Sequence, residues 1–162
     1  MLRDLALHYV GRYATSRAKL LVYLRRKLRE RGWAGERSAD PDGLADRFVA
    51  LGYIDDAAYA AMKGAALTRR GYGARRVDDS LRAAGIADPD RAGAAEQARG
   101  DSWAAADRFA RRKRIGPYAA QPPDPRQRER MIAAFLRAGH AMDVARTWVD
   151  ARPGEPPASE CE

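Results

Sequence analysis

The sequence has very few of the residues that build disulfides or metal centres. Cysteine occurs once, as Cys161, and histidine twice, as His8 and His140. A single thiol cannot close a disulfide within the chain, and two histidines so far apart lack the spacing of metal ligands. We therefore expect a chain without disulfide, metal or cofactor, in which both histidines are structural or exposed.

Long apolar runs and alternating patterns are also absent. No segment is long and apolar enough to cross a bilayer, and residues 1–13 carry charges throughout, where a secretory signal peptide needs an apolar run. Nothing alternates between apolar and polar residues as a half-buried strand would. The sequence therefore favours an all-α protein of the cytoplasm with no membrane partner.

Catalytic motifs are missing in the same way. The run GYG at residues 71–73 begins like a dinucleotide fingerprint, but Arg76 occupies the place of the third glycine and no strand is expected before it. Asp55 and Asp56 resemble a metal or acid–base pair, yet they stand just before a predicted helix, where carboxylates cap free N–H groups. We find no nucleophile paired with a base and expect no enzymatic activity.

What the sequence does contain is helical periodicity along almost its whole length. Apolar residues recur every three or four positions, which predicts amphipathic helices. The expected helices cover residues 2–13, 16–31, 41–51, 56–69, 74–84, 89–98, 103–114, 125–138 and 142–151. The Asp-Pro pairs at residues 40–41, 88–89 and 124–125 are each expected to open a helix, with the aspartate as its cap.

Three glycines mark a repeated unit. Gly32, Gly85 and Gly139 each follow an apolar segment, where a residue without a Cβ can take the left-handed conformation that ends a helix. They are roughly fifty residues apart, which is long enough for three short helices. The predicted fold is therefore all-α, an elongated and curved tandem array of three three-helix repeats. The predicted boundaries are 1–53, 54–100 and 101–151, followed by a disordered tail at 152–162.

Positive charge exceeds negative charge along the chain. There are 30 lysines and arginines against 22 aspartates and glutamates, which gives a formal net charge of +8 and an isoelectric point of about 10.0. The natural partner of such a chain is a polyanion or an acidic protein surface.

Cations recur in or beside the first turn of the middle helix of each predicted unit. These residues are Arg17 and Lys19, Arg75 and Arg76, and Arg126 and Arg128. The helix dipole disfavours a positive charge there by about 0.3–1 kcal/mol, so we expect an anion to offset it. The anion is either an internal carboxylate, such as Asp46 or Asp56, or a phosphate or carboxylate of a partner, held by free N–H groups and a guanidinium.

Further basic runs occupy residues 25–31, 69–70 and 108–114. They can form a stripe along one side of a helix, although part of such a stripe is expected to be solvated surface. Tyr72 and Tyr118 lie beside two of the runs, where they can stack on a base or pack into the turns. The residues that we expect to contact a partner protein or DNA are Arg17, Arg25, Arg26, Arg69, Arg70, Arg75, Arg76, Arg111, Arg112 and Arg114.

Two sequence elements resemble those of the RecX family of bacterial regulatory proteins. One is GYIDDAAYA at residues 52–60, and the other is RRGYGARRV at residues 69–77, which Leu81, Gly85 and Ile86 continue. The first unit resembles the family pattern through Ser16, Arg17, Leu20, Leu24, Leu28 and Gly32. Lys19 stands where the family usually has glutamate. The resemblance covers about the first half of the chain in motif and the remainder in layout.

The resemblance implies a regulator of the RecA recombinase. Members of the family are built from tandem three-helix repeats and lie in the deep groove of the RecA filament on DNA. They inhibit filament extension, strand exchange, ATP hydrolysis and co-protease activity, and so modulate recombination, DNA repair and the SOS response. The partner implied is the RecA filament, with single- or double-stranded DNA as a further contact, and we expect a monomer.

Two other functions use the same basic residues. A stand-alone nucleic-acid-binding helical module would bind bare DNA or RNA with an affinity that falls steeply with salt. A helical adaptor for an acidic protein would not respond to DNA at all.

Overall fold

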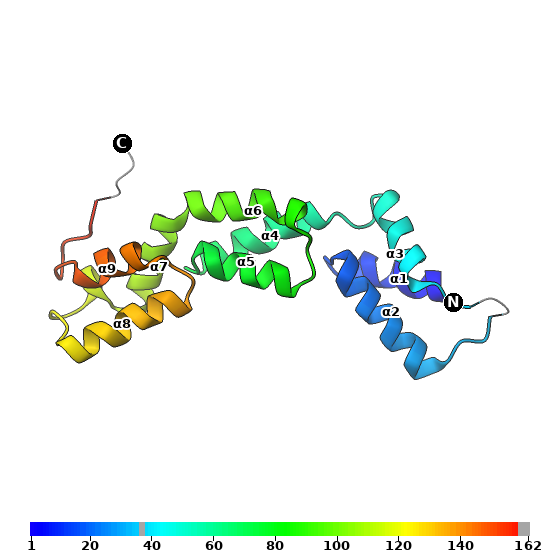
Figure 1. Cartoon of the computed structure of the whole chain (residues 1–162), viewed down its shortest axis with the longest axis horizontal. Helices are drawn as coiled ribbons and strands as arrows, with labels where there is room; N and C mark the ends of the chain where they lie inside the picture. The colour runs from blue at the N-terminus through cyan, green and yellow to red at the C-terminus, as the bar shows by residue number, and fades with distance from the viewer. Residues whose placement is uncertain (36–37, 159–162) are drawn as a thin grey trace.

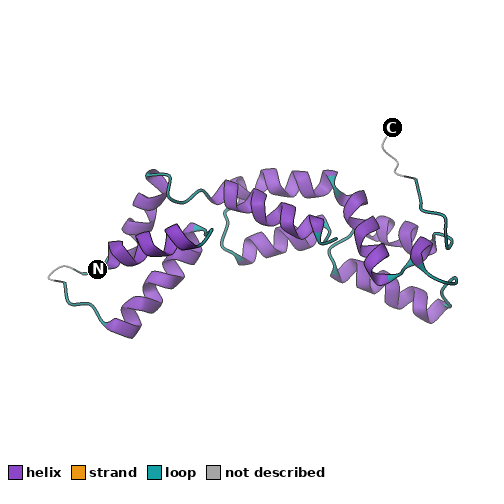
Figure 2. Cartoon of the chain, turned by 180° about the vertical axis from the view of Figure 1, so that it is seen from behind, coloured by secondary structure: helices purple, strands orange, loops and turns teal. Residues whose placement is uncertain are grey.

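The computed structural model describes residues 1–35 and 38–158. Within these ranges the chain forms nine α-helices and one short 3-10 helix, and no strand (Figure 2). No helix in the same ranges combines the length and the apolar character that a membrane span needs. The prediction of an all-α fold is therefore confirmed.

The helices begin and end within two residues of the predicted positions. They are α1 Leu2–Arg12, α2 Arg17–Arg31, α3 Pro41–Ala50, α4 Asp56–Arg69, α5 Ala74–Ala83, α6 Asp88–Gly100, α7 Ser102–Lys113, α8 Pro125–Arg137 and α9 Met142–Asp150. The 3-10 helix η1, Gly116–Tyr118, lies in the connection between α7 and α8.

Two of the three Asp-Pro pairs cap their helices as predicted. The Asp40 carboxylate accepts the N–H of Gly43 over 2.9 Å, and Asp124 forms a capping box with Gln127. Asp88 does not act as a cap, which corrects the prediction. The helix α6 already includes Asp88, its N-cap is Ala87, and the Asp88 carboxylate instead pairs with the Arg91 guanidinium at 2.7 Å.

The helices form three groups, each around its own apolar cluster. We name α1–α3 unit 1, α4–α6 unit 2 and α7–α9 unit 3. The clusters centre on Leu20, Leu24 and Phe48 in unit 1, on Tyr59, Val77 and Leu81 in unit 2, and on Phe109, Phe135 and Trp148 in unit 3. The units follow one another along the long axis of an elongated body, with the chain ends at opposite sides (Figure 1). That the units are copies of one repeat stays a prediction.

The middle helices of neighbouring units meet end to end. The C-terminal end of α8 contacts the first turn of α5, where the N–H groups of Gly73 and Arg75 donate to the carbonyls of Ala138 and Gly139 over 2.9 and 3.2 Å. The next joint is similar, because the hydroxyl of Ser16 at the start of α2 donates to a carbonyl at the end of α5, over 3.1 Å. The negative end of one helix dipole therefore lies against the positive end of the next.

The glycines that end the middle helices take positive φ angles, as predicted. Gly32, Gly85 and Gly139 have φ of 69°, 74° and 91°. Gly139 must be glycine for a second reason besides its positive φ. A Cβ there would overlap the backbone of Arg76 in the neighbouring unit.

The segment after α9 starts with a turn attached to unit 3. The N–H of Gly154 donates to the carbonyl of Pro117 over 2.8 Å, so this part of the tail predicted to be disordered has a defined contact. Residues 159–162, including Cys161, lie outside the described residues.

Candidate anion-binding site

A basic groove lies at the joint between units 2 and 3. It has a volume of about 720 Å³, and five of its lining residues carry positive charge. We call it the Tyr72 groove, and it is lined by Arg70, Tyr72, Arg76, Phe109, Arg112, Lys113, Ala134, Arg137 and Ala138. None of the described residues that line it is acidic.

Three guanidinium groups surround one aromatic ring in this groove. The central carbons of Arg70, Arg76 and Arg112 lie 5.6, 5.9 and 5.8 Å from the centre of the Tyr72 ring. Arg112 also donates to the carbonyl of Arg70, which ties the end of α7 to the end of α4. The ring attracts each cation through its electron-rich face, and so holds three like charges close together.

The turn between α4 and α5 brings these groups together. Gly71 has a φ of 86°, and a Cβ there would lie 2.9 Å from the backbone nitrogen of Phe109 in α7. Glycine is therefore needed for α7 to pack directly against the turn. This approach places Arg112, in the last turn of α7, beside Tyr72, while Arg137 arrives from the last turn of α8.

The arrangement is electrostatically unbalanced. Cations that share one groove repel each other, and the repulsion is relieved when an anion enters. Guanidinium groups suit carboxylates and phosphates in particular, because they donate two parallel hydrogen bonds. The Tyr72 groove therefore has the chemistry of a site for a carboxylate or a phosphodiester.

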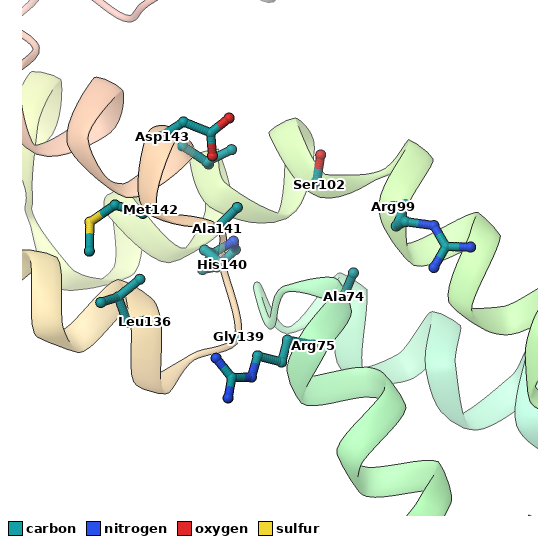
Figure 3. A pocket seen from close by; sticks show the side chains of 11 residues that line it. Ala74, Arg75, Arg99, Ser102, Leu136, Gly139, His140, Ala141, Met142 and Asp143 are labelled. Atoms are coloured by element: carbon teal, nitrogen blue, oxygen red, sulfur yellow. The ribbon is translucent and has the colours of Figure 1, made fainter.

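A second hollow lies at the same joint and has a different character. This pocket of about 660 Å³ is lined by Ala74, Arg75, Arg99, Ser102, Leu136, Gly139, His140, Ala141, Met142, Asp143 and Val144 (Figure 3). Its lining combines apolar side chains with charges of both signs. Its lining residues include fewer cations than those of the Tyr72 groove.

His140 is used inside the fold. Its side chain is buried, and Nε2 lies 2.9 Å from the carbonyl oxygen of Gly71, to which it donates as the neutral ring. Burial lowers the pKa of His140 below its ordinary value, because the charged ring would lose its hydration. His140 therefore links units 2 and 3 as a structural histidine.

The predicted residues of unit 1 are engaged by carboxylates. Arg17 pairs with Asp46 at 2.6 Å, and Arg25 donates two hydrogen bonds to Asp42. Arg26 lies 3.6 Å from Glu30. The hydrogen bond from Arg17 lowers the pKa of the Asp46 carboxyl. These pairs are open to solvent, so another anion can replace the carboxylate at small cost.

The other predicted arginines do not all join the groove. Arg70, Arg76 and Arg112 line it, whereas Arg75 lines the second pocket at this joint. Arg111 is held by the Asp107 carboxylate at 3.3 Å and by the Tyr118 hydroxyl at 2.9 Å. Arg69 and Arg114 are exposed, at the ends of α4 and α7. The structure thus brings three of the ten predicted residues together in the Tyr72 groove.

Two of the cations at the starts of the middle helices, Arg17 and Arg128, pair with carboxylates of the same chain. Arg17 meets both predicted carboxylates, since its Nε contacts Asp46 and its backbone N–H donates to Asp56 over 2.9 Å. In unit 3, Arg128 pairs with Asp150 at 2.5 Å. At the start of α5, the N–H groups of Gly73 and Arg75 donate to the carbonyls of Ala138 and Gly139, just after α8. The N–H groups of Arg17, Gly73 and Arg75 are thus bonded within the protein, and a partner's phosphate or carboxylate at these helix starts stays a prediction.

Two cations of the Tyr72 groove were not among the predicted contact residues. Lys113 lies in a basic run that the sequence shows, but Arg137 belongs to no motif. The one signal for Arg137 is its place in a final helical turn just before Gly139, where the dipole favours a cation. Tyr118 packs into its turn, because its hydroxyl donates to Asp107.

Comparisons with known proteins point in one direction. No family model matches the chain. The chain is 33% identical over 160 residues to the regulatory protein RecX of Myxococcus xanthus (strain DK1622), which covers 94% of this chain and 86% of the relative. A crystal structure of a regulatory protein RecX superimposes with a TM-score of 0.68 at 20% identity, over 88% of this chain and 67% of the other. A crystal structure of RecX from Lactobacillus salivarius gives 0.63 at 16% identity, over 90% of both chains.

Proposed function

This chain belongs to the RecX family of regulatory proteins, and we propose that it regulates the RecA recombinase by binding the RecA filament on DNA. In this proposal the protein inhibits filament extension, strand exchange, ATP hydrolysis and co-protease activity, and so modulates DNA repair and the SOS response. It acts by occupying a surface, with no reaction of its own.

The observation that supports this function best is the Tyr72 groove. Five cations line it, and the described lining residues include no carboxylate that could neutralise them. A filament on DNA presents acidic side chains and phosphodiesters, and both are ligands for clustered guanidinium groups. We assign the filament contact to Arg70, Arg76, Arg112, Lys113 and Arg137.

The shape of the body fits the same role. Three units in a row form a long body (Figure 1), and the groove lies at the joint between its second and third units. A long body held at such a point extends along a filament in both directions, so that it can touch more than one protomer. The solvent-open arginines of unit 1, Arg17 and Arg25, are secondary contacts in this proposal.

The test is the ATPase activity of RecA on single-stranded DNA with increasing amounts of this protein. The double variant Arg76→Glu/Arg112→Glu reverses two charges of the groove, and we expect it to need roughly tenfold more protein for half-inhibition. The matched control, Arg47→Glu/Arg146→Glu, changes the net charge equally at exposed positions outside the groove. We expect it to inhibit like the unmodified chain, and both to keep the helical circular dichroism spectrum.

Different results would identify the other functions. Equal inhibition by the groove variant and the control would reject the assignment of the filament contact to the groove. No inhibition by the unmodified chain, together with strongly salt-dependent binding to bare DNA, would identify a nucleic-acid-binding module. If the chain neither inhibits RecA nor binds DNA, the remaining candidate function is that of an adaptor for an acidic protein.

A further inference from the structure

Unit 1 contains a second cationic hollow, of about 410 Å³, between α1 and α2. We call it the Tyr13 groove, and it is lined by His8, Tyr9, Tyr13, Tyr23, Arg26 and Lys27. Unit 1 lies at the end of the body away from unit 3 (Figure 1). Neither the filament contact proposed above nor the predicted contact residues account for the three tyrosines of the groove.

The three rings form one continuous aromatic surface. Tyr9 and Tyr23 stack with centres 4.2 Å apart and planes at 15°, and Tyr13 leans on Tyr9 with centres 5.3 Å apart. Tyr13 directly follows the last turn of α1 as its C-cap, and it lines the groove together with Tyr9 and Tyr23. Tyr13 remains 51% exposed, so part of its ring is open to a further planar group.

Cations surround this aromatic surface. The Arg12 guanidinium lies 5.8 Å from the centre of the Tyr13 ring, and Arg26 and Lys27 lie 5.8 and 6.0 Å from that of Tyr23. Glu30 contacts two of them, Lys27 at 2.7 Å and Arg26 at 3.6 Å. One carboxylate therefore balances one of these two cations, and the groove with Arg12 at its edge keeps a positive charge.

The combination of three aromatic rings with surrounding cations favours one class of ligand. An apolar ligand would not need the cations, and a simple anion would not need three rings. A nucleotide within a single strand needs both, because its base stacks on aromatic side chains while its phosphate pairs with cations. In a duplex the bases are already stacked and paired, so they cannot enter. The volume also lies in the usual range for small-ligand sites, about 300–1,000 Å³.

We propose that the Tyr13 groove binds an unstacked base of single-stranded nucleic acid, with its phosphate held by Arg12, Arg26 and Lys27. The base packs against Tyr13, the most exposed of the three rings. This site is separate from the Tyr72 groove, and its existence does not depend on the filament contact proposed above.

The experiment measures binding of the full chain to a fluorescein-labelled oligothymidylate by fluorescence anisotropy, without RecA. The second ligand is an oligonucleotide of the same length whose central nucleotides are abasic, so that the phosphate charge is equal. We expect the abasic ligand to bind the unmodified chain at least about fivefold more weakly, because a base that stacks on a protein ring contributes that much or more.

Variants locate the effect at the groove. Tyr13→Ala is expected to weaken oligothymidylate binding at least about fivefold and to remove the difference between the two ligands. Tyr13→Phe keeps the ring and should keep the binding. Tyr53→Ala is the matched control, because Tyr53 also belongs to the N-terminal part of the chain, is 54% exposed and lies outside the groove.

Two results would overturn the proposal. One is equal affinity of the unmodified chain for the normal and the abasic oligonucleotide, a comparison that needs no variant and therefore no assumption about folding. The other is unchanged binding by Tyr13→Ala when Tyr53→Ala is also unchanged. Either result can occur whether or not the Tyr72 groove binds RecA, so the two proposals fail independently.

Discussion

The backbone N–H of Gly73 donates to the carbonyl of Ala138 over 2.9 Å, although the four helices α5 to α8 all lie between these two residues in the sequence. This hydrogen bond joins the start of α5 to the end of α8. It shows that units 2 and 3 are connected through the ends of their middle helices, and the joint itself requires a residue without a side chain.

Gly73→Ala should therefore destabilise the protein. A Cβ at residue 73 would overlap the carbonyl oxygen of Gly139, so the two helix ends must move apart. We expect the free energy of unfolding in urea to fall by about 1–3 kcal/mol. Gly93→Ala is the control, since a Cβ at this position in α6 would point into open space and should add about 0.5–1 kcal/mol of stability. A neutral Gly73→Ala variant would contradict this account of the joint.

Ser16→Ala should weaken the joint between units 1 and 2. The buried Ser16 hydroxyl caps α2 by accepting the Lys19 N–H, and it also donates to the Ala84 carbonyl. Its loss removes a cap and leaves that carbonyl unpaired, at a cost of about 1–3 kcal/mol. Asp124→Ala removes a cap that bonds only within α8. It should therefore lower the melting temperature less than Ser16→Ala does. If Ser16→Ala and Asp124→Ala destabilise the protein equally, the hydrogen bond from Ser16 to the Ala84 carbonyl adds no stability.

Arg91→Leu should lower the urea midpoint more than Arg82→Leu. Both arginines pair with Asp78, at 2.9 and 2.8 Å. Arg91 is 8% exposed and also donates to the Ile86 carbonyl, whereas Arg82 lies on the surface. Removing Arg91 leaves a buried acceptor without its donor, and removing Arg82 does not. Similar midpoints for the two variants would show that the buried contacts of Arg91 contribute little.

His140 should make the joint between units 2 and 3 sensitive to acid. Burial depresses the pKa of His140 in the folded protein, so below its ordinary value of 6.5 the unfolded chain binds a proton that the folded chain does not. This contribution to stability is therefore present above that value and is lost as the pH falls. We expect the urea midpoint to drop between about pH 7.5 and pH 5.5, where carboxyl groups scarcely titrate, and to drop less in His140→Gln. An equal drop in both proteins would assign the effect to other groups.

The fold could be predicted from the sequence because its signals are local. Apolar periodicity, the Asp-Pro caps at residues 40 and 124, and the closing glycines each act within a few residues of the element they define. Asp88 shows where such a signal fails. The same Asp-Pro pair is present, but Arg91 one turn later attracts the carboxylate, and the helix begins one residue earlier.

The candidate site could be predicted only in part, because it forms where segments distant in sequence meet. The runs containing Arg70, Arg76 and Arg112 are visible in the sequence, but that they surround one ring depends on the packing of α7 against Gly71. Arg137 arrives through the contact of α8 with α5. No local pattern separates such arginines from Arg25, whose partner Asp42 lies 17 residues away.

The two joints differ in the atoms that form them. Between units 2 and 3, main-chain groups bond directly to main-chain groups, and Gly71, Gly73 and Gly139 approach backbone atoms of the neighbouring unit, whereas Gly85 approaches the Ala18 side chain at the other joint. Between units 1 and 2, contacts come from the hydroxyl of Ser16, the carboxylate of Asp56 and the ammonium of Lys19 over Tyr59. Side chains rotate more readily than the backbone deforms. We therefore expect thermal bending to be greatest at the first joint, so that unit 1 moves relative to units 2 and 3.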